Sequence, residues 1–307
     1  MVKQKKYHSV VVPMVTPFTE KGDVDLDAAE KIVDHIVGGG ACPFSLGTTG
    51  EAPSISPSAK AQLVETVVKK NARRTMTYAG IINNCQASSV QMAERFFELG
   101  VDVVVACVPS YYPLTGDDIL NYFENLAQRV PGPLMLYNIP VTTGISIPLE
   151  VFDKLSHIPR IVGLKDSVRD IDRIKHAAEL WKDREDFSYL CGCTSLSTTA
   201  LAAGADGIVP SVGNIVPVLF TKLYNSVLTG DIEQANQCQS RSDNIADIFQ
   251  KDRGLSESLS MLKGIMHVMG FCEPKVLPPL RDLDANQIEA LREAVNNIQL
   301  LEEDNSL

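Results

Sequence analysis

The feature that most constrains the fold is an alternation of short apolar runs with amphipathic segments, repeated along residues 10–228. The apolar runs are rich in Val, Ile and Leu, and such continuous hydrophobicity is typical of parallel strands that are buried on both faces. The segments between them carry apolar residues at helical spacing. The predicted strands are residues 10–18, 43–46, 76–82, 101–108, 134–137, 161–167, 187–190 and 207–211.

Helix start and stop signals separate these strands. Asp25 is predicted to cap the first helix, Ser56 and Pro57 to begin the second, and Gly100 to end the third. Eight strand–helix units without an intervening linker favour a closed TIM (β/α)8 barrel over an open doubly wound sheet. Residues 232–250, 256–269 and 286–298 read as helices only. We therefore expect an α/β protein with a barrel over residues 1–230 and a C-terminal helical extension, residues 231–307, packed on it.

Charge and composition exclude several classes of partner. The formal net charge of −10 argues against a nucleic-acid partner, which usually meets a concentrated basic surface. The first apolar run is short and broken by Pro13 and Pro17, so neither a signal peptide nor a membrane span is predicted. Seven scattered cysteines are typical of reduced thiols in a cytoplasmic protein. The closest pair, Cys191 and Cys193, lacks the spacing of a zinc site, and no metal is expected.

The predicted sixth strand ends by presenting a charged residue, Lys165, after an apolar run. Active sites of these barrels lie where strands end and the following loops begin. A partly desolvated lysine amine there could form an imine with a keto substrate. A lysine at a strand end is, on its own, more often a solvated charge. The residues at the neighbouring strand ends therefore have to distinguish a solvated charge from an imine-forming amine.

Those strand ends carry groups that imine chemistry can use. Imine formation needs a proton shuttle, for which the phenol of Tyr137 is suitable, and an anchor for the substrate carboxylate. Backbone N–H groups beside the hydroxyls of Thr48 and Thr49 could supply that anchor without a formal positive charge. Each residue alone has a plainer interpretation: a buried aromatic for Tyr137 and an ordinary turn for the threonines.

Four motifs make the chain resemble a known family, the dihydrodipicolinate synthase and N-acetylneuraminate lyase family of Schiff-base, pyruvate-handling barrel enzymes. The motifs occur in the family order and at family-like spacing, and the resemblance runs from about Val10 into the C-terminal helices, including Pro278-Pro279-Leu280. The motifs are Gly47-Thr48-Thr49-Gly50-Glu51, Tyr111-Tyr112, Tyr137-Asn138-Ile139-Pro140 and Gly163-Leu164-Lys165-Asp166-Ser167.

The resemblance implies a role for each catalytic residue. Lys165 forms the imine with a 2-oxo acid, and Tyr137 is the general acid/base. Thr48 relays protons between Tyr137 and Tyr111, which reaches in from a neighbouring subunit of a homotetramer; Tyr112 takes this part if the register differs by one. No cofactor is implied, because the protonated imine is the electron sink. The implied substrate-binding residues are Thr48, Thr49, Gly47, Ser167, Thr142, Gly192 and Val209, with Thr143 and Cys193 lining the same mouth.

Two departures from the family pattern bear on the substrate. The synthases usually carry an arginine two residues after the motif proline, where this chain has Thr142. The sialic acid lyases carry an acidic pair after the strand-seven glycine, where this chain has Cys193 and Thr194. By elimination, the resemblance implies a class I aldolase or lyase that acts on a 2-keto-3-deoxy sugar acid or 4-hydroxy-2-oxoglutarate and releases pyruvate and an aldehyde.

The alternatives left open within the family are 4-hydroxy-tetrahydrodipicolinate synthase, N-acetylneuraminate lyase and a dehydratase for keto-deoxy sugar acids. An alternative of another class is a non-catalytic barrel that binds an oxo acid. Loss of Lys165, Tyr137 or Thr48 would be the expected signature of such a barrel, and all three are present.

Overall fold

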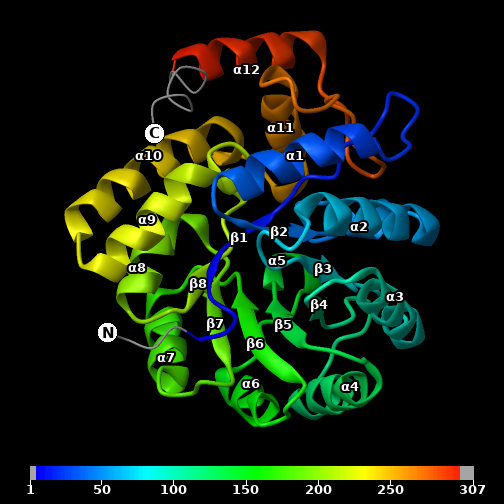
Figure 1. Ribbon diagram of the computed structural model, residues 1–307, viewed down its shortest axis with the longest axis vertical. Coiled ribbons are helices and arrows are strands. Elements are labelled where there is room, and N and C mark those ends of the chain that lie inside the picture. Colours follow the sequence, from blue (N-terminus) through cyan, green and yellow to red (C-terminus); the bar gives the residue numbers. More distant parts are fainter. Residues whose placement is uncertain (1–4, 298–307) are drawn as a thin grey trace.

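The computed structural model describes residues 5–297 as a closed, parallel, eight-stranded barrel surrounded by helices (Figure 1). Each strand pairs with the next in the chain, and β1 pairs with β8 to close the barrel. This confirms the predicted TIM barrel. The strands are β1 (Ser9–Pro13), β2 (Cys42–Ser45), β3 (Tyr78–Gly80), β4 (Val103–Cys107), β5 (Leu134–Asn138), β6 (Ile161–Asp166), β7 (Ser188–Cys191) and β8 (Gly207–Ile208).

Helices follow the strands in turn and form the outer layer, and further helices extend the chain after the barrel closes. The α-helices are α1 (Leu26–Gly38), α2 (Pro57–Asn71), α3 (Gln86–Leu99), α4 (Gly116–Arg129), α5 (Pro140–Thr143), α6 (Leu149–Ser156), α7 (Ile171–Trp181), α8 (Ser197–Ala202), α9 (Pro217–Thr229), α10 (Ile232–Gln250), α11 (Leu255–Val268) and α12 (Ala285–Asn297). Short 3-10 helices are η1 (Ala52–Ser54), η2 (Thr194–Leu196) and η3 (Ser211–Asn214).

The predicted helix signals act as expected. The Asp25 carboxylate accepts a hydrogen bond from the backbone N–H of Ala28 at 3.0 Å, and the Ser56 hydroxyl accepts one from Ala59 at 3.4 Å. Gly100 ends α3 with φ of 101°, a left-handed conformation that glycine adopts without steric cost. These local signals set the starts of α1 and α2 and the end of α3.

Five strands are shorter than predicted. The first is expected over residues 10–18 but ends at Pro13, the third is limited to Tyr78–Gly80, and the eighth to Gly207–Ile208. The fourth and the sixth, expected over residues 101–108 and 161–167, are limited to Val103–Cys107 and Ile161–Asp166. The residues that follow them, such as Met14 and Ile81, are buried in loops at the barrel mouth, and buried loops are apolar like strands. The short helix α5 was not predicted, because four residues are too few to show a helical period.

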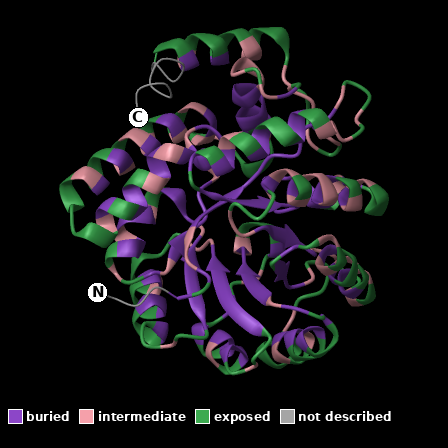
Figure 2. Cartoon of the chain, in the orientation of Figure 1, coloured by how far each residue is buried: buried purple, intermediate pink, exposed green. Residues whose placement is uncertain are grey.

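Two apolar cores result from the closed sheet. One lies inside the barrel and includes Phe44, Tyr78, Cys107 and Tyr137. The other, larger core lies between the outer face of the strands and the surrounding helices. Figure 2 accordingly shows the strands as buried along their whole length, while the helices expose one face. Tyr137 is thus a side chain of the barrel interior.

The C-terminal helices pack on the barrel helices. Helix α10 lies against α8 and α9, and α11 contacts both α10 and α12. Figure 1 shows α12 at the top edge of the molecule, next to α11. The division at residue 230 stays a prediction, as does the last residue of the final predicted helix, Ile298, which lies outside the described residues. No helix among residues 5–297 combines the length and apolar character needed to cross a membrane.

Candidate active site

Lys165 is buried at the mouth of the barrel. It lies on β6 beside Tyr137 of β5 and Leu190 of β7, and it is only 4% exposed. Its Nζ is 3.8 Å from the ring centroid of Tyr137 and 5.0 Å from that of Phe44. No hydrogen bond or ion pair of this amine is found within residues 5–297. Burial lowers the pKa of Lys165 to about 7, so a large fraction of the amine is a free base at neutral pH.

The phenol of Tyr137 lies next to this amine and bonds to a threonine. The Tyr137 hydroxyl and Thr48 Oγ1 are 3.4 Å apart. Burial raises the pKa of Tyr137 to about 12, and hydrogen bonds from Thr48 and Ser167 act in the opposite direction. The phenol therefore carries its proton at neutral pH and is available as a donor. The predicted neighbours Lys165, Tyr137 and Thr48 do lie together.

The loop after β2 presents unpaired backbone donors. The N–H groups of Gly50 and Glu51 turn back to the carbonyls of Gly47 and Thr48, at 3.2 and 3.1 Å. No acceptor is found in the described part of the chain for the N–H groups of Thr48 and Thr49. Gly50 has to be small, because a Cβ there would lie 3.0 Å from the carbonyl oxygen of Met14. The loop can therefore bind an anion through its backbone.

A buried polar network that sequence reasoning missed fixes the ends of β5 and β6. Asn138 donates from Nδ2 to Asp166 Oδ1 at 2.9 Å, and Arg173 of α7 donates from Nε to Asp166 Oδ2 at 2.7 Å. Arg173 also donates to the carbonyl of Ile147 at 2.8 Å. Asn138 and Asp166 directly follow Tyr137 and Lys165, so this network holds both functional side chains in register. Only the position of Asp166 next to the lysine could have suggested it.

Replacing Arg173 by methionine should lower the free energy of unfolding by about 3–5 kcal/mol, because it leaves the Asp166 carboxylate buried without its cation. Urea denaturation measures this loss. Arg184→Met, which removes an ion pair with the exposed Asp186, serves as the control and should cost far less. Equal losses of unfolding free energy in the two variants would contradict the idea that Arg173→Met leaves the Asp166 carboxylate buried without a compensating charge.

Ser167 and Gly192 lie against each other. A Cβ on Gly192 would clash with Ser167 Oγ, so a glycine at residue 192 leaves room for that hydroxyl. A hydrogen bond from Ser167 is among the causes that lower the pKa of Tyr137 against the effect of burial, so Ser167 lies beside that phenol. Its predicted contact with a substrate hydroxyl stays a prediction.

The remaining predicted binding residues differ in their surroundings. Thr142 is exposed on α5. Thr143 is buried, and its hydroxyl is engaged with backbone groups of its own loop, including the carbonyl of Ile139 at 3.1 Å. Val209 is buried in the interior core with Tyr137, and Cys193 is buried with its Sγ 3.5 Å from Ser195 Oγ. Thr143 is therefore poorly suited to the predicted mouth-lining role.

Tyr111 and Tyr112 lie on the surface, in the loop between β4 and α4. They are 78% and 68% exposed, and their rings meet edge to face with centroids 5.1 Å apart. Among the described residues, no hydrogen bond links Tyr111 to Thr48. The predicted relay through Tyr111 needs a second copy of the chain and stays a prediction.

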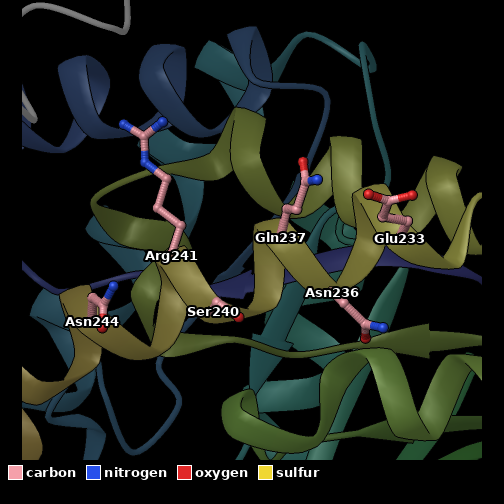
Figure 3. A pocket seen from close by; sticks show the side chains of 6 residues that line it. All are labelled: Glu233, Asn236, Gln237, Ser240, Arg241 and Asn244. Atoms are coloured by element: carbon pink, nitrogen blue, oxygen red, sulfur yellow. The ribbon is translucent and has the colours of Figure 1, made fainter.

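Two surface hollows lie away from these residues. One is a shallow, polar depression along the outer face of α10, and the other lies between the end of α1 and α9. Figure 3 shows the first, lined by Glu233, Asn236, Gln237, Ser240, Arg241 and Asn244. Neither includes a predicted site residue. Among residues 5–297, no cluster of His, Cys, Asp and Glu has the arrangement of a metal site.

A closed barrel with a buried lysine amine, a phenol and an anion-binding loop at its mouth has the groups of the class I aldolases and lyases. The model of the dihydrodipicolinate synthetase family matches residues 6–298, and the chain belongs to this family of pyruvate-dependent aldolases and lyases.

Known relatives match along nearly the whole chain. An uncharacterized DapA-like lyase of Halobacterium salinarum is 30% identical over 298 residues, which is 96% of this chain and 95% of the relative. A 4-hydroxy-tetrahydrodipicolinate synthase of Oceanobacillus iheyensis is 28% identical over 294 residues, 95% of this chain and 98% of the relative. The structure of dihydrodipicolinate synthase from Bacteroides thetaiotaomicron superimposes with a TM-score of 0.90 at 26% identity, covering 96% of this chain and 100% of the other.

Proposed function

We propose that this chain is a lysine Schiff-base lyase that cleaves a 2-keto-3-deoxy sugar acid or 4-hydroxy-2-oxoglutarate into pyruvate and an aldehyde. The observation that carries the proposal is the buried amine of Lys165, which lies 3.8 Å from the Tyr137 ring centroid and whose pKa burial lowers to about 7. A free-base amine in an apolar pocket is a nucleophile for a keto carbon.

The first step joins the substrate to the enzyme. Nζ of Lys165 attacks the C2 carbonyl carbon, and the oxygen takes up a proton to give a carbinolamine. The phenol of Tyr137 then protonates the departing hydroxyl, so that water leaves and a protonated imine forms. The N–H groups of Thr48 and Thr49, for which residues 5–297 supply no acceptor, hold the substrate carboxylate.

The second step breaks the bond between C3 and C4. A base removes the proton of the C4 hydroxyl, the C3–C4 electrons move toward the imine nitrogen, and an aldehyde and an enamine result. The base in this step is the phenolate of Tyr137, which formed when the phenol gave its proton to the departing hydroxyl in the first step; taking up the C4 hydroxyl proton regenerates the phenol. Protonation of the enamine at C3 and hydrolysis of the imine then release pyruvate and free Lys165.

The distal part of the substrate is assigned by elimination. Thr142 and Cys193 stand where the synthases and sialic acid lyases of the family have an arginine and an acidic residue. Uncharged groups at these two positions suit the hydroxylated chain of a 2-keto-3-deoxy sugar acid. The second candidate is 4-hydroxy-tetrahydrodipicolinate synthase, favoured by the relative of that name that is 28% identical.

A substrate panel separates the two candidates. Pyruvate release is measured with a set of 2-keto-3-deoxy sugar acids and with 4-hydroxy-2-oxoglutarate, and condensation is measured with pyruvate and aspartate semialdehyde. A kcat/KM for pyruvate release that exceeds the kcat/KM for condensation supports the lyase. A higher kcat/KM for condensation overturns it in favour of the synthase, and turnover of neither set supports a non-catalytic barrel.

Assembly and location are part of the proposal. A homotetramer in which Tyr111 approaches the Thr48 of a neighbouring subunit gives a purpose to two exposed, adjacent tyrosines. A monomer by analytical ultracentrifugation would contradict it. The cysteines at all seven positions are free thiols, which suits the reducing cytoplasm.

Imine formation should depend on pH with an apparent pKa of about 7, the value to which burial lowers the pKa of Lys165 from 10.5. The rate rises as the pH approaches about 7, because deprotonation creates the nucleophile, and levels off above it. Samples mixed with pyruvate at different pH values are quenched with borohydride and weighed by mass spectrometry. A rate that is still rising above about pH 9 would indicate an ordinary lysine instead.

A further inference from the structure

A buried ion pair ties the anion-binding loop to the C-terminal helices. The Glu51 carboxylate, at the end of the Gly47–Glu51 loop, is paired through Oε1 with Nζ of Lys263 in α11, and the two side chains are 2% and 1% exposed. Oε2 of Glu51 accepts a hydrogen bond from the backbone N–H of Leu277 at 2.9 Å. Nζ of Lys263 also lies 4.2 Å from the ring centroid of Phe18. One carboxylate therefore joins the loop to two later segments of the chain.

The pair holds the loop in a strained shape. Glu51 has φ of 54°, a left-handed conformation that a residue with a Cβ keeps only when its surroundings impose it. In this shape the N–H of Glu51 donates to the carbonyl of Thr48 at 3.1 Å, and the Thr16 hydroxyl donates to the carbonyl of Gly50 at 2.7 Å. The same turn leaves the N–H groups of Thr48 and Thr49 without acceptors in the described chain.

The position of the pair favours a geometric role over a purely stabilising one. The middle of helix α11, residues 260–266, is buried, whereas its first turn is exposed. Figure 2 shows much of this helix as buried. Placing two charges there costs desolvation energy that their attraction often fails to exceed, so an apolar pair of similar size could serve stability equally well. A charged pair specifies one geometry for the loop. Glu51 lies two residues from Thr49, so its displacement moves the anion-binding groups.

We propose that Glu51 and Lys263 are positioning residues, through which the C-terminal helices hold the loop that binds the substrate carboxylate. Neither residue touches the reacting atoms. The inference rests on the proposed function, because it assigns the Thr48 and Thr49 N–H groups to the carboxylate of a 2-oxo acid.

The test compares pyruvate affinity with stability. For each variant, the rate of adduct formation on Lys165 in the presence of borohydride is measured over a range of pyruvate concentrations, and the thermal unfolding midpoint is recorded. The variants are Glu51→Gln and the double variant Glu51→Gln with Lys263→Met, which leaves no unpaired buried charge. The matched control is Asp206→Asn, because Asp206 forms another buried ion pair, with Lys5 at 2.8 Å, away from the loop.

We expect Glu51→Gln to raise the half-saturating pyruvate concentration by about tenfold, since small displacements of positioning groups have large effects. The double variant should recover much of the unfolding midpoint and keep the raised concentration. Asp206→Asn should lower the midpoint alone. A half-saturating concentration equal to that of the wild type in the double variant would overturn the inference and leave the proposed function intact. A wild-type protein that forms no adduct at any pyruvate concentration would instead contradict the proposed function itself.

Discussion

Replacement of Lys165 by methionine should abolish turnover and make the protein more stable. Turnover should fall by about 10⁴-fold or more, because no other group can form the imine. At pH 7 the free energy of unfolding should rise by roughly 2–4 kcal/mol, because the methionine removes an amine that burial penalises. The effect on stability follows from the burial of the Lys165 amine, for which the described residues supply no acceptor.

The pH dependence of this stability difference provides the control. Burial lowers the pKa of Lys165 from 10.5 to about 7, so between these values the unfolded chain binds more protons than the folded one. The wild type therefore gains stability as the pH rises through this window, and the advantage of Lys165→Met shrinks. Urea denaturation at about pH 7 and about pH 9.5 measures the difference in unfolding free energy between the two proteins. If Lys165→Met is less stable than the wild type at both pH values, the claim that burial desolvates the Lys165 amine is contradicted.

Replacement of Tyr137 by phenylalanine should lower kcat by about 10²–10⁴-fold, the usual contribution of a positioned acid or base. The ring that lies 3.8 Å from Nζ of Lys165 remains, so the amine stays desolvated and the pH dependence of imine formation keeps its apparent pKa. Steady-state kinetics measures the loss, and the borohydride assay over pH measures the retained pKa.

Tyr189→Phe is the matched control for Tyr137→Phe. The Tyr189 hydroxyl is buried on β7 without a partner in the described chain, and its ring lies in the outer core rather than inside the barrel. Its removal should leave kcat unchanged and cost no stability, because no hydrogen bond is lost. Comparable kcat values for Tyr137→Phe and the wild type would exclude the phenol as the proton donor.

The fold was predictable where the signals are local. The apolar period of each run and the caps at Asp25 and Ser56 involve neighbours in the sequence, and the barrel order follows from the alternation alone. Strand ends were less predictable. Met14 and the residues after it are as buried as a strand, so an apolar pattern cannot show where pairing stops.

The proximity of Lys165, Tyr137 and Thr48 in the candidate site was predictable, because parallel strands deliver their last residues to one mouth. The buried contacts that support these residues were not predictable. The partner of Glu51 lies 212 positions away, and Lys263 reads in the sequence as an ordinary helical charge. Arg173 likewise gives no sign of reaching Asp166. Such pairings depend on how helices pack on the barrel, which the period of one segment does not encode.

The central claim, that Lys165 forms an imine with a 2-oxo acid, is tested most directly by trapping it. The wild-type protein is incubated with pyruvate and borohydride, digested, and its peptides are identified by mass spectrometry. The account predicts one adduct, on the peptide that contains Lys165, and none in Lys165→Met. No adduct in the wild type, or an adduct that persists in Lys165→Met, would contradict it.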